Sequence, residues 1–147
     1  MAIILYSHSM SAGLAFTQAL YVLVFIGDKT RQGMADFVST PQISETLNIP
    51  KPSVVRILKL LGQEGLVETG AGIKGGVRLS EDPGSISLDR VYRAIEGSRP
   101  LFRLDHFLNV TGARPEAAAA RISATLKETE EEFNGSLRRR SLADLLG

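Results

Sequence analysis

Two prolines separated by one residue divide two short apolar patterns, and this corner restricts the fold strongly. Pro50 disfavours a helical conformation for the residue before it, so a helix has to end there. Pro52 suits the first turn of a new helix, where a missing N–H costs nothing. A tight turn between two helices is therefore predicted within NIPKPSVVRILKLLGQEGLV, residues 48–67, which is the outline of a helix-turn-helix.

The helix before this corner is predicted over residues 40–47. Ser39 is placed to cap its N-terminus, and Gln42 has the spacing of the second half of a capping box. Val38 and Ile43 stand at the two positions of a hydrophobic staple. These local signals fix where the helix begins.

The helix after the corner is predicted over about residues 52–64. Its apolar residues recur at the i, i+3, i+4, i+7 spacing of a buried stripe: Val54, Ile57, Leu58 and Leu61. The other side is partly basic: Lys51, Ser53, Arg56, Lys59 or Leu60, and Gln63. A helix roughly 20 Å long and about 10 Å across fits the ~12 Å major groove of B-DNA, where Val55 could touch a thymine methyl. Basic residues on a helix are usually only a solvated surface, so this face alone does not establish DNA binding.

Residues 66–80 are predicted to form a two-stranded hairpin after Gly65 ends the helix. The runs 66–69 and 77–80 alternate in polarity, and glycines free the tip between them: Gly70, Gly72, Gly75 and Gly76. Lys74 lies in this tip, and Arg78 is expected to point away from its apolar neighbours.

Helix, turn, basic helix and basic hairpin follow one another in the order of a winged helix. Residues 51–78 hold five basic and two acidic residues, a local charge of +3 in a chain whose net charge is +1. The glycine-rich tip does not match a P-loop, because no lysine in it precedes a Ser or Thr that opens a helix. Spacing and local charge together favour DNA binding.

The composition limits other functions. The chain has 147 residues and no cysteine, which excludes disulfides and cysteine-held zinc or iron–sulfur centres within it. With only two histidines, His8 and His106, no Ser-His-acid arrangement is persuasive, so neither an enzyme nor a metal site is predicted. His106 is expected to pack among its apolar neighbours, with a role as a ligand or pH sensor as the alternative. The acidic run at 128–132 is expected to be a solvated helix face.

The most apolar stretch, residues 12–27, is shorter than the ~20 residues that cross a bilayer and is interrupted by polar side chains. It is predicted to be a helix buried on nearly all sides, followed by a loop over residues 28–38. No membrane contact is expected, and the predicted location is the cytoplasm.

The C-terminal part is predicted to supply assembly. Pro115 opens a helix, and its seam residues alternate by three and four: Ala119, Ile122, Leu126, Thr129 and Phe133. Such a stripe would be exposed on a lone domain, so we expect it to pair across a two-fold axis. Asn134-Gly135 is expected to break the helix. Ser141 and Asp144 have capping-box spacing for a last short helix, whose leucines are expected to dock: Leu142, Leu145 and Leu146.

Four segments resemble one family, the Rrf-type winged-helix regulators that include IscR, NsrR and CymR. They are VSTPQISETLNIP, IPKPSVVRILKLLGQEGLV, GAGIKGGVRL and ISLDRVYRAIEG. In the last, Ser87 caps a helix that Ile86 and Val91 staple and Glu96-Gly97 ends. The text VYRAIEGSRPLF is similar to the cysteine-poor YwnA-like branch. The resemblance covers residues 11–97 well and implies a dimeric transcription factor, usually a repressor.

The helix face and the resemblance together predict which residues contact DNA. They are Thr40, Lys51, Pro52, Ser53, Val55, Arg56, Lys59, Lys74, Gly75 and Arg78. Many family members carry an aromatic residue where Ser53 stands, which implies a different operator sequence. Cluster-bearing members carry three cysteines after the EG pair, and this chain has none, so no iron–sulfur cluster or other cofactor is predicted.

The predicted organisation is an N-terminal extension (1–10), a winged-helix domain (11–97), a connector (98–114), and a dimerisation helix with a short terminal helix (115–147). The extension is a fusion remnant, an upstream start or a functional arm, and the sequence leaves these open. The predicted fold class is mainly α with a small β-hairpin wing. The predicted function is a homodimeric repressor that reads a palindromic operator in double-stranded DNA and answers an effector, a small molecule or a protein. The alternative is a winged-helix module for protein–protein contact that binds DNA weakly or not at all.

Overall fold

Six helices and one β-hairpin make up the part of the chain that the computed structural model describes, residues 13–31, 33, 36–70 and 75–147. The helices are α2 (Leu14–Arg31), α3 (Thr40–Leu47), α4 (Lys51–Gln63), α5 (Leu88–Glu96), α6 (Ala113–Arg138) and α7 (Leu142–Leu146). The strands are β1 (Val67–Thr69) and β2 (Val77–Leu79), and a short 3-10 helix, η1 (Pro83–Ser85), follows them. This mainly helical chain with one hairpin confirms the predicted fold class. The proposed extension lies outside the described residues.

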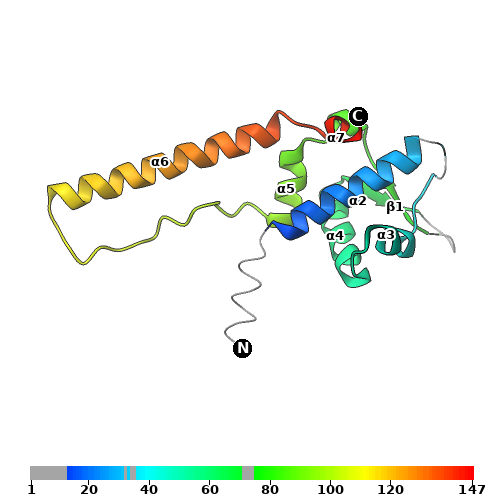
Figure 1. Ribbon diagram of the computed structural model, residues 1–147, viewed down its shortest axis with the longest axis horizontal. Coiled ribbons are helices and arrows are strands. Elements are labelled where there is room, and N and C mark those ends of the chain that lie inside the picture. Colours follow the sequence, from blue (N-terminus) through cyan, green and yellow to red (C-terminus); the bar gives the residue numbers. More distant parts are fainter. Residues whose placement is uncertain (1–12, 32, 34–35, 71–74) are drawn as a thin grey trace.

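Helix α2 crosses the main body of the molecule (Figure 1). It continues to Arg31, so the predicted loop at 28–38 begins later than expected. The prediction that the helix is buried on nearly all sides is also wrong, because Tyr21 is 63% exposed and only one side faces the core. Apolar residues on its outer side have no cover within the described chain.

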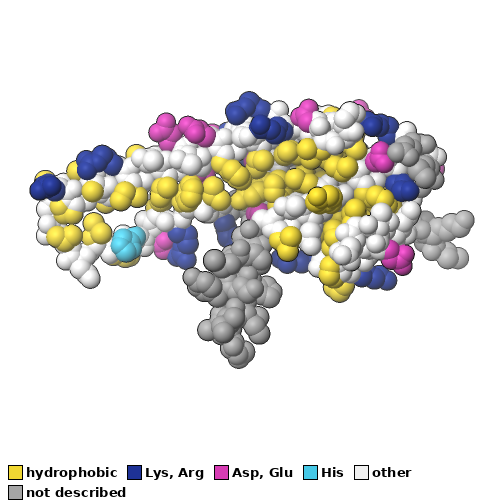
Figure 2. Space-filling model, viewed as in Figure 1, with side chains coloured by type: hydrophobic (Ala, Val, Ile, Leu, Met, Phe, Trp, Pro, Cys, Tyr) yellow, Lys and Arg dark blue, Asp and Glu magenta, His cyan; other side chains and the backbone are white. Residues whose placement is uncertain are grey.

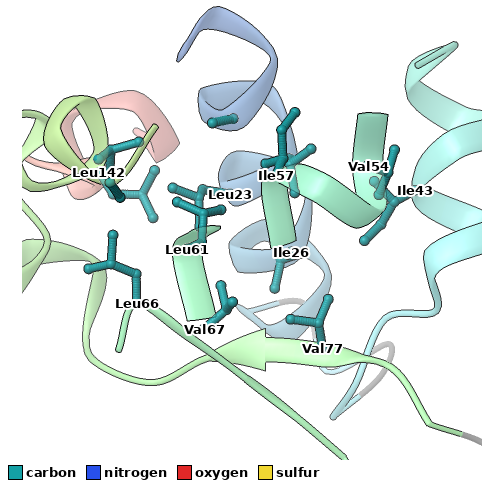
Figure 3. Close-up of a cluster of buried hydrophobic side chains, with 14 of the residues drawn as sticks. Leu23, Ile26, Ile43, Val54, Ile57, Leu61, Leu66, Val67, Val77 and Leu142 are labelled. Carbon is teal, nitrogen blue, oxygen red and sulfur yellow. The ribbon is translucent and has the colours of Figure 1, made fainter. Parts of the chain in front are cut away.

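The core is formed where α2 meets α4, the hairpin and α7 (Figure 3). Leu23 and Ile26 of α2 are fully buried, as are Leu61 of α4 and Leu142 of α7. Each buried side chain of this size contributes about 1.5–3 kcal/mol to the free energy of unfolding. The C-terminal helix is therefore part of the winged-helix core although it lies far away in the sequence.

Two backbone hydrogen bonds attach the C-terminal segment to the start of α5. The N–H of Leu142 donates to the carbonyl of Ile86 (2.9 Å), and the N–H of Leu88 donates to the carbonyl of Arg140 (2.9 Å). The predicted capping box is present, because the N–H of Ser141 donates to Asp144 Oδ2 (2.8 Å). Of the three leucines expected to dock, Leu142 and Leu146 do so, whereas Leu145 is 43% exposed.

Helix α5 begins and ends as predicted. Ser87 caps it by accepting a hydrogen bond from the N–H of Arg90 (3.2 Å), and Gly97 ends it with φ +77°. Ile86 and Val91, the predicted staple, are both fully buried. The helix packs against α2 and α4 on one side and α6 on the other.

Helix α6 is an arm that projects from the main body, with residues 98–112 running back along it (Figure 1). It begins two residues before Pro115 and continues through Asn134 and Gly135, so the predicted break is wrong. A glycine inside a helix costs only about 1 kcal/mol, and Phe133 next to it packs on Tyr92 with ring centroids 5.3 Å apart. Helix α6 is described throughout, and none of its residues is buried.

Among the described residues, no helix combines the length and the apolar character needed to cross a membrane.

Gly76 should be among the least replaceable residues of the hairpin. Its φ is +123°, and a Cβ atom there would lie 2.9 Å from the carbonyl oxygen of Val38. We expect Gly76→Ala to lower the free energy of unfolding by about 2–3 kcal/mol in urea denaturation. Gly84→Ala is the matched control, since a Cβ atom there meets nothing within 4 Å. Equal stability of the two variants would contradict the strain assigned to Gly76.

Candidate nucleic-acid interface

The turn between α3 and α4 is held by side-chain and backbone hydrogen bonds. Ser39 caps α3 as predicted, accepting from the N–H of Gln42 (3.3 Å). At the other end, Asn48 adopts the left-handed conformation (φ +53°). Ser44 then binds Ile49 twice: its hydroxyl donates to the Ile49 carbonyl (2.7 Å), and its carbonyl accepts the Ile49 N–H (3.2 Å). Because Ile49 is also buried, the direction in which α4 starts is fixed.

Helix α4 begins at Lys51, one residue before the predicted start. The carbonyl of Pro50 accepts from the N–H groups of Ser53 (2.9 Å) and Val54 (3.1 Å), so the first turn forms around the two prolines. Pro52 is the second helical residue, where its missing N–H breaks no bond. The corner predicted from the sequence is confirmed.

The apolar stripe of α4 is buried as predicted, with Val54, Ile57 and Leu61 inside and Leu58 partly buried. Five of the six α4 residues predicted to meet DNA are exposed: Lys51, Pro52, Val55, Arg56 and Lys59. None of the three basic ones forms an ion pair within the described part of the chain. The candidate surface is therefore an exposed, basic helix face.

Ser53 lies differently from its predicted place on this face. With three other residues of α4 it lines a hollow of about 70 Å³, and residues of α2 and Ile95 of α5 complete the walls. The reason is helical periodicity: at about 100° per residue, Ser53 falls beside the buried stripe rather than opposite to it. The structure places it half-buried at the margin of the face.

Helix α4 ends in a Schellman motif. Gly65, with φ +71°, donates its N–H to the carbonyl of Gly62 (3.0 Å), and the N–H of Leu66 donates to the carbonyl of Leu61 (3.0 Å). Leu61 and Leu66 are both fully buried. The motif turns the chain directly into β1, so helix and hairpin are neighbours as predicted.

The hairpin pairs antiparallel, with Glu68 opposite Arg78 and Thr69 opposite Val77. Val38 extends the hairpin through an antiparallel β-bridge, in which its N–H and its carbonyl both form 2.9 Å hydrogen bonds with Val77. This bridge was not predicted from the sequence. Gly75 is half-buried. Lys74, in the tip, lies outside the described residues.

Arg78 is exposed and points away from the apolar side, as predicted, but it is held by two partners. Its Nε lies 2.5 Å from Glu68 Oε1, and its guanidinium stacks over the ring of Phe37 at 4.7 Å from the centroid. A Cβ atom on Gly70 would lie 3.0 Å from that ring, a contact so close that the ring would have to shift. Glu68 could have been predicted, since residues opposite each other in a hairpin pair. Phe37 carries no such signal.

The other candidate residues lie apart from this surface or at its edge. Thr40 is half-buried as the first residue of α3. His106 is exposed, and Phe107 beside it is 90% exposed, so the expected packing of His106 is wrong. The connector runs along the arm and away from the core (Figure 1), so the core does not cover the histidine. In the acidic run, Glu131 pairs with Arg138 (2.6 Å).

The fold and its exposed basic helix define a winged helix-turn-helix protein. Residues 14–147 match the model of the Rrf2 family, described as an iron-dependent transcriptional regulator. The chain belongs to the Rrf2 family.

Several known proteins are similar to this chain. NsrR of Bacillus subtilis, an HTH-type transcriptional regulator, is 38% identical over 78 residues, which are 53% of this chain and 51% of NsrR. The chain thus spans about half the length of this relative. YwnA of the same organism is 26% identical over 113 residues, 77% of this chain and 84% of YwnA. The solved structure of CymR (YrzC), the global cysteine regulator of B. subtilis, matches with a TM-score of 0.63 and 19% identity over 90% of this chain and 92% of that one, a likeness of fold.

Iron, named in the family description, can be tested against the ligands that this chain offers. Iron–sulfur clusters in proteins are held by cysteine thiolates, and this chain has no cysteine. Within the described residues, no three His, Asp or Glu side chains gather closely enough to hold a metal ion. The residues present therefore do not fit a thiolate-held cluster.

We expect Ser44→Ala to loosen the turn that aims α4. The Ile49 carbonyl would lose the hydroxyl donor at 2.7 Å, which should lower the free energy of unfolding by about 1 kcal/mol in urea denaturation. Ser80→Ala serves as control, because Ser80 is exposed and its hydroxyl makes no hydrogen bond within the described part of the chain. A Ser44→Ala variant as stable as its control would mean that the prolines alone hold the turn.

Proposed function

We propose that this protein is a sequence-specific DNA-binding transcriptional regulator that acts as a homodimer and represses transcription. The exposed basic face of α4, fixed at both ends by the turn and the Schellman motif, is the observation that carries the proposal. Membership of the Rrf2 family supports it.

In this proposal α4 lies in the major groove. Arg56 and Lys59, which are exposed and have no ion pair within the described chain, reach base edges and phosphates. Val55, 52% exposed, is suited to a thymine methyl. Thr40, Lys51 and Pro52 contact the sugar-phosphate backbone of the DNA beside the groove. Ser53 adds a DNA contact from the margin of the helix face. Because many members of the family carry an aromatic residue where Ser53 stands, we expect this protein to bind a different operator sequence from theirs.

The wing is proposed to hold the adjacent phosphates through Arg78, with Lys74 and Gly75 at its tip. Glu68 neutralises Arg78 in the free protein at 2.5 Å. A phosphate that approaches must compete with this carboxylate, so the wing contributes less affinity than its arginine alone would suggest. We therefore assign most of the affinity to α4.

The dimer is proposed to form along α6. A helix of 26 residues with none of them buried needs a partner along its length, and Figure 2 shows apolar side chains gathered along the arm. Two seam residues face outward, Ile122 (60% exposed) and Thr129, whereas Phe133 is used inside its own chain against Tyr92. Ala119 and Leu126, which are half-buried, complete the proposed seam. A second copy of the same arm is the proposed occupant.

Two such subunits would place two α4 helices on a palindromic operator. One helix alone contacts too few base pairs to select a unique site in the genome. A dimer seated there would block transcription. The proposed role is binding in the cytoplasm, without catalysis and without a thiolate-held cluster, because no cysteine is present and both histidines lack a catalytic partner in the sequence.

We expect Arg56→Ala to weaken operator binding at least about tenfold, since one specific base contact contributes ~1–3 kcal/mol. Thermal stability should stay nearly unchanged because the side chain is exposed. The measurement is a titration of operator fragments selected from genomic DNA, at two salt concentrations. Arg114→Ala, an exposed arginine on α6, is the control. Wild-type affinity in Arg56→Ala would remove this residue from the interface, and a folded dimer that binds no duplex would favour the protein-contact alternative.

We expect Ile122→Asp to produce a folded monomer without specific DNA binding. Burying a carboxylate in an apolar seam costs several kcal/mol, whereas on an exposed position of the free arm it costs little. Sedimentation velocity measures the oligomeric state. Lys127→Asp, on the opposite side of α6 by helical periodicity, should leave a dimer. A dimeric Ile122→Asp protein that still protects the operator would place the interface elsewhere.

A further inference from the structure

A cavity of about 200 Å³ lies where the arm joins the winged helix, between α5, α6 and the first residues of the connector. Side chains from all three segments line it, among them Asp89, Tyr92, Arg93, Arg99, Glu130 and Phe133. The proposed DNA surface and the proposed seam do not account for it. Its size exceeds the ~150 Å³ that holds a benzene molecule and is below the ~300 Å³ of drug-sized pockets.

The lining of this cavity is strongly polar and balanced in charge, with two carboxylates and two guanidinium groups. Asp89 is buried, and while its Oδ2 accepts from Arg93 Nε at 2.9 Å, its Oδ1 has no hydrogen-bond partner within the described structure. A buried acceptor without a donor costs about 1–3 kcal/mol. Glu130, which also lines the cavity, accepts the backbone N–H of Leu101.

Two aromatic rings also line the cavity. Tyr92 and Phe133 pack edge to face with centroids 5.3 Å apart. Partial burial, together with the carboxylates of Glu96 and Glu130, raises the pKa of Tyr92, so its hydroxyl keeps its proton and can donate. Arg99, on the connector, is exposed. Carboxylate acceptors, guanidinium and hydroxyl donors, and two aromatic rings therefore line one cavity that is large enough for a small molecule.

We propose that this cavity binds a free amino acid, a small molecule that carries both an ammonium and a carboxylate. The ammonium would meet the carboxylates of Asp89 and Glu130, the carboxylate would meet Arg99, and the side chain would lie against Tyr92 and Phe133. A ligand with only one charge would leave the opposite pair of lining charges without a partner, which disfavours simple amines and simple acids.

The position of the cavity connects it to the recognition helix. Arg93 and Gly97, in the last turn of α5, line the cavity, while Ile95 in the same turn lines the hollow that holds Ser53 and Arg56 of α4. The last turn of α5 therefore borders both the proposed ligand cavity and the α4 side chains that are proposed to contact DNA. We infer that occupancy shifts the packing of α5 against α4, which makes the amino acid an effector; this second step rests on the proposed function.

Binding is tested on the full chain without DNA. Isothermal titration with the common amino acids should find at least one ligand of millimolar or better affinity. For that ligand, the matched amine without the carboxylate and the matched acid without the amine should each bind at least about tenfold more weakly. If no amino acid binds at millimolar concentration, or if the single-charge analogues bind equally well, the proposal is overturned.

Two variants test the position of the site. Two matched controls show whether removing a charge elsewhere on α6 also changes the affinity. Arg99→Ala and Glu130→Gln should each weaken binding at least about tenfold, and the amide oxygen of the Glu130→Gln variant keeps an acceptor for the N–H of Leu101. Arg114→Ala and Glu116→Gln, exposed on the far end of α6, should bind like the wild type. Unchanged affinity in both site variants would place the ligand elsewhere.

The coupling is measured by hydrogen exchange of α4 in the free and amino-acid-bound protein. Ligand binding should change the exchange of residues 51–63 in the wild type and leave it unchanged in Arg99→Ala. Bound ligand with unaltered α4 exchange would overturn the effector role. Because neither experiment contains DNA, their outcomes are independent of whether the proposed operator binding holds.

Discussion

Leu23 and Ile26 on one side of α2 are fully buried, and α4, the hairpin, α5 and α7 all reach the same core (Figure 3). Removing water from this shared apolar surface is what holds together elements that are short by themselves. Helices of eight or nine residues, such as α3 and α5, would not be stable alone in water. The position of α4, and with it the basic face, depends on this packing.

Helix α5 joins the winged-helix core to the α6 arm. On one side it packs against α2 and α4, and on the other it contacts α6. Tyr92 links both sides, because its ring meets Phe16 of α2 at 5.2 Å and Phe133 of α6 at 5.3 Å. The arm that is proposed to pair two subunits is therefore attached to the same helix that supports the recognition helix. In the proposed mechanism, this arrangement is the route by which a ligand at the joint acts on the recognition helix.

Local signals in the sequence determined much of the fold. Ser39, Ser87 and Ser141 cap the helices at which they were predicted, and Gly65 and Gly97 end α4 and α5 with positive φ. These assignments succeed because a cap or a terminator acts on residues only two to four positions away. The exposed side of α4 follows in the same way, since the buried stripe at i, i+3, i+4 and i+7 fixes which residues face outward.

What the sequence could not determine involves partners that are distant along the chain. Nothing local shows that Arg78 stacks on Phe37 or that Val38 joins β2, and the predicted docking of Leu142 named no partner in the core. Nor does any local signal show that the connector leaves His106 exposed. Capping and helical periodicity depend on residues that are close in the sequence, so the sequence alone determined α3, α4 and α5, the turn between α3 and α4, and most of the basic face. Which surfaces meet depends on the packing of the whole chain, so only the tertiary structure decided the arm, the cavity beside α5 and the pairing of the wing arginine.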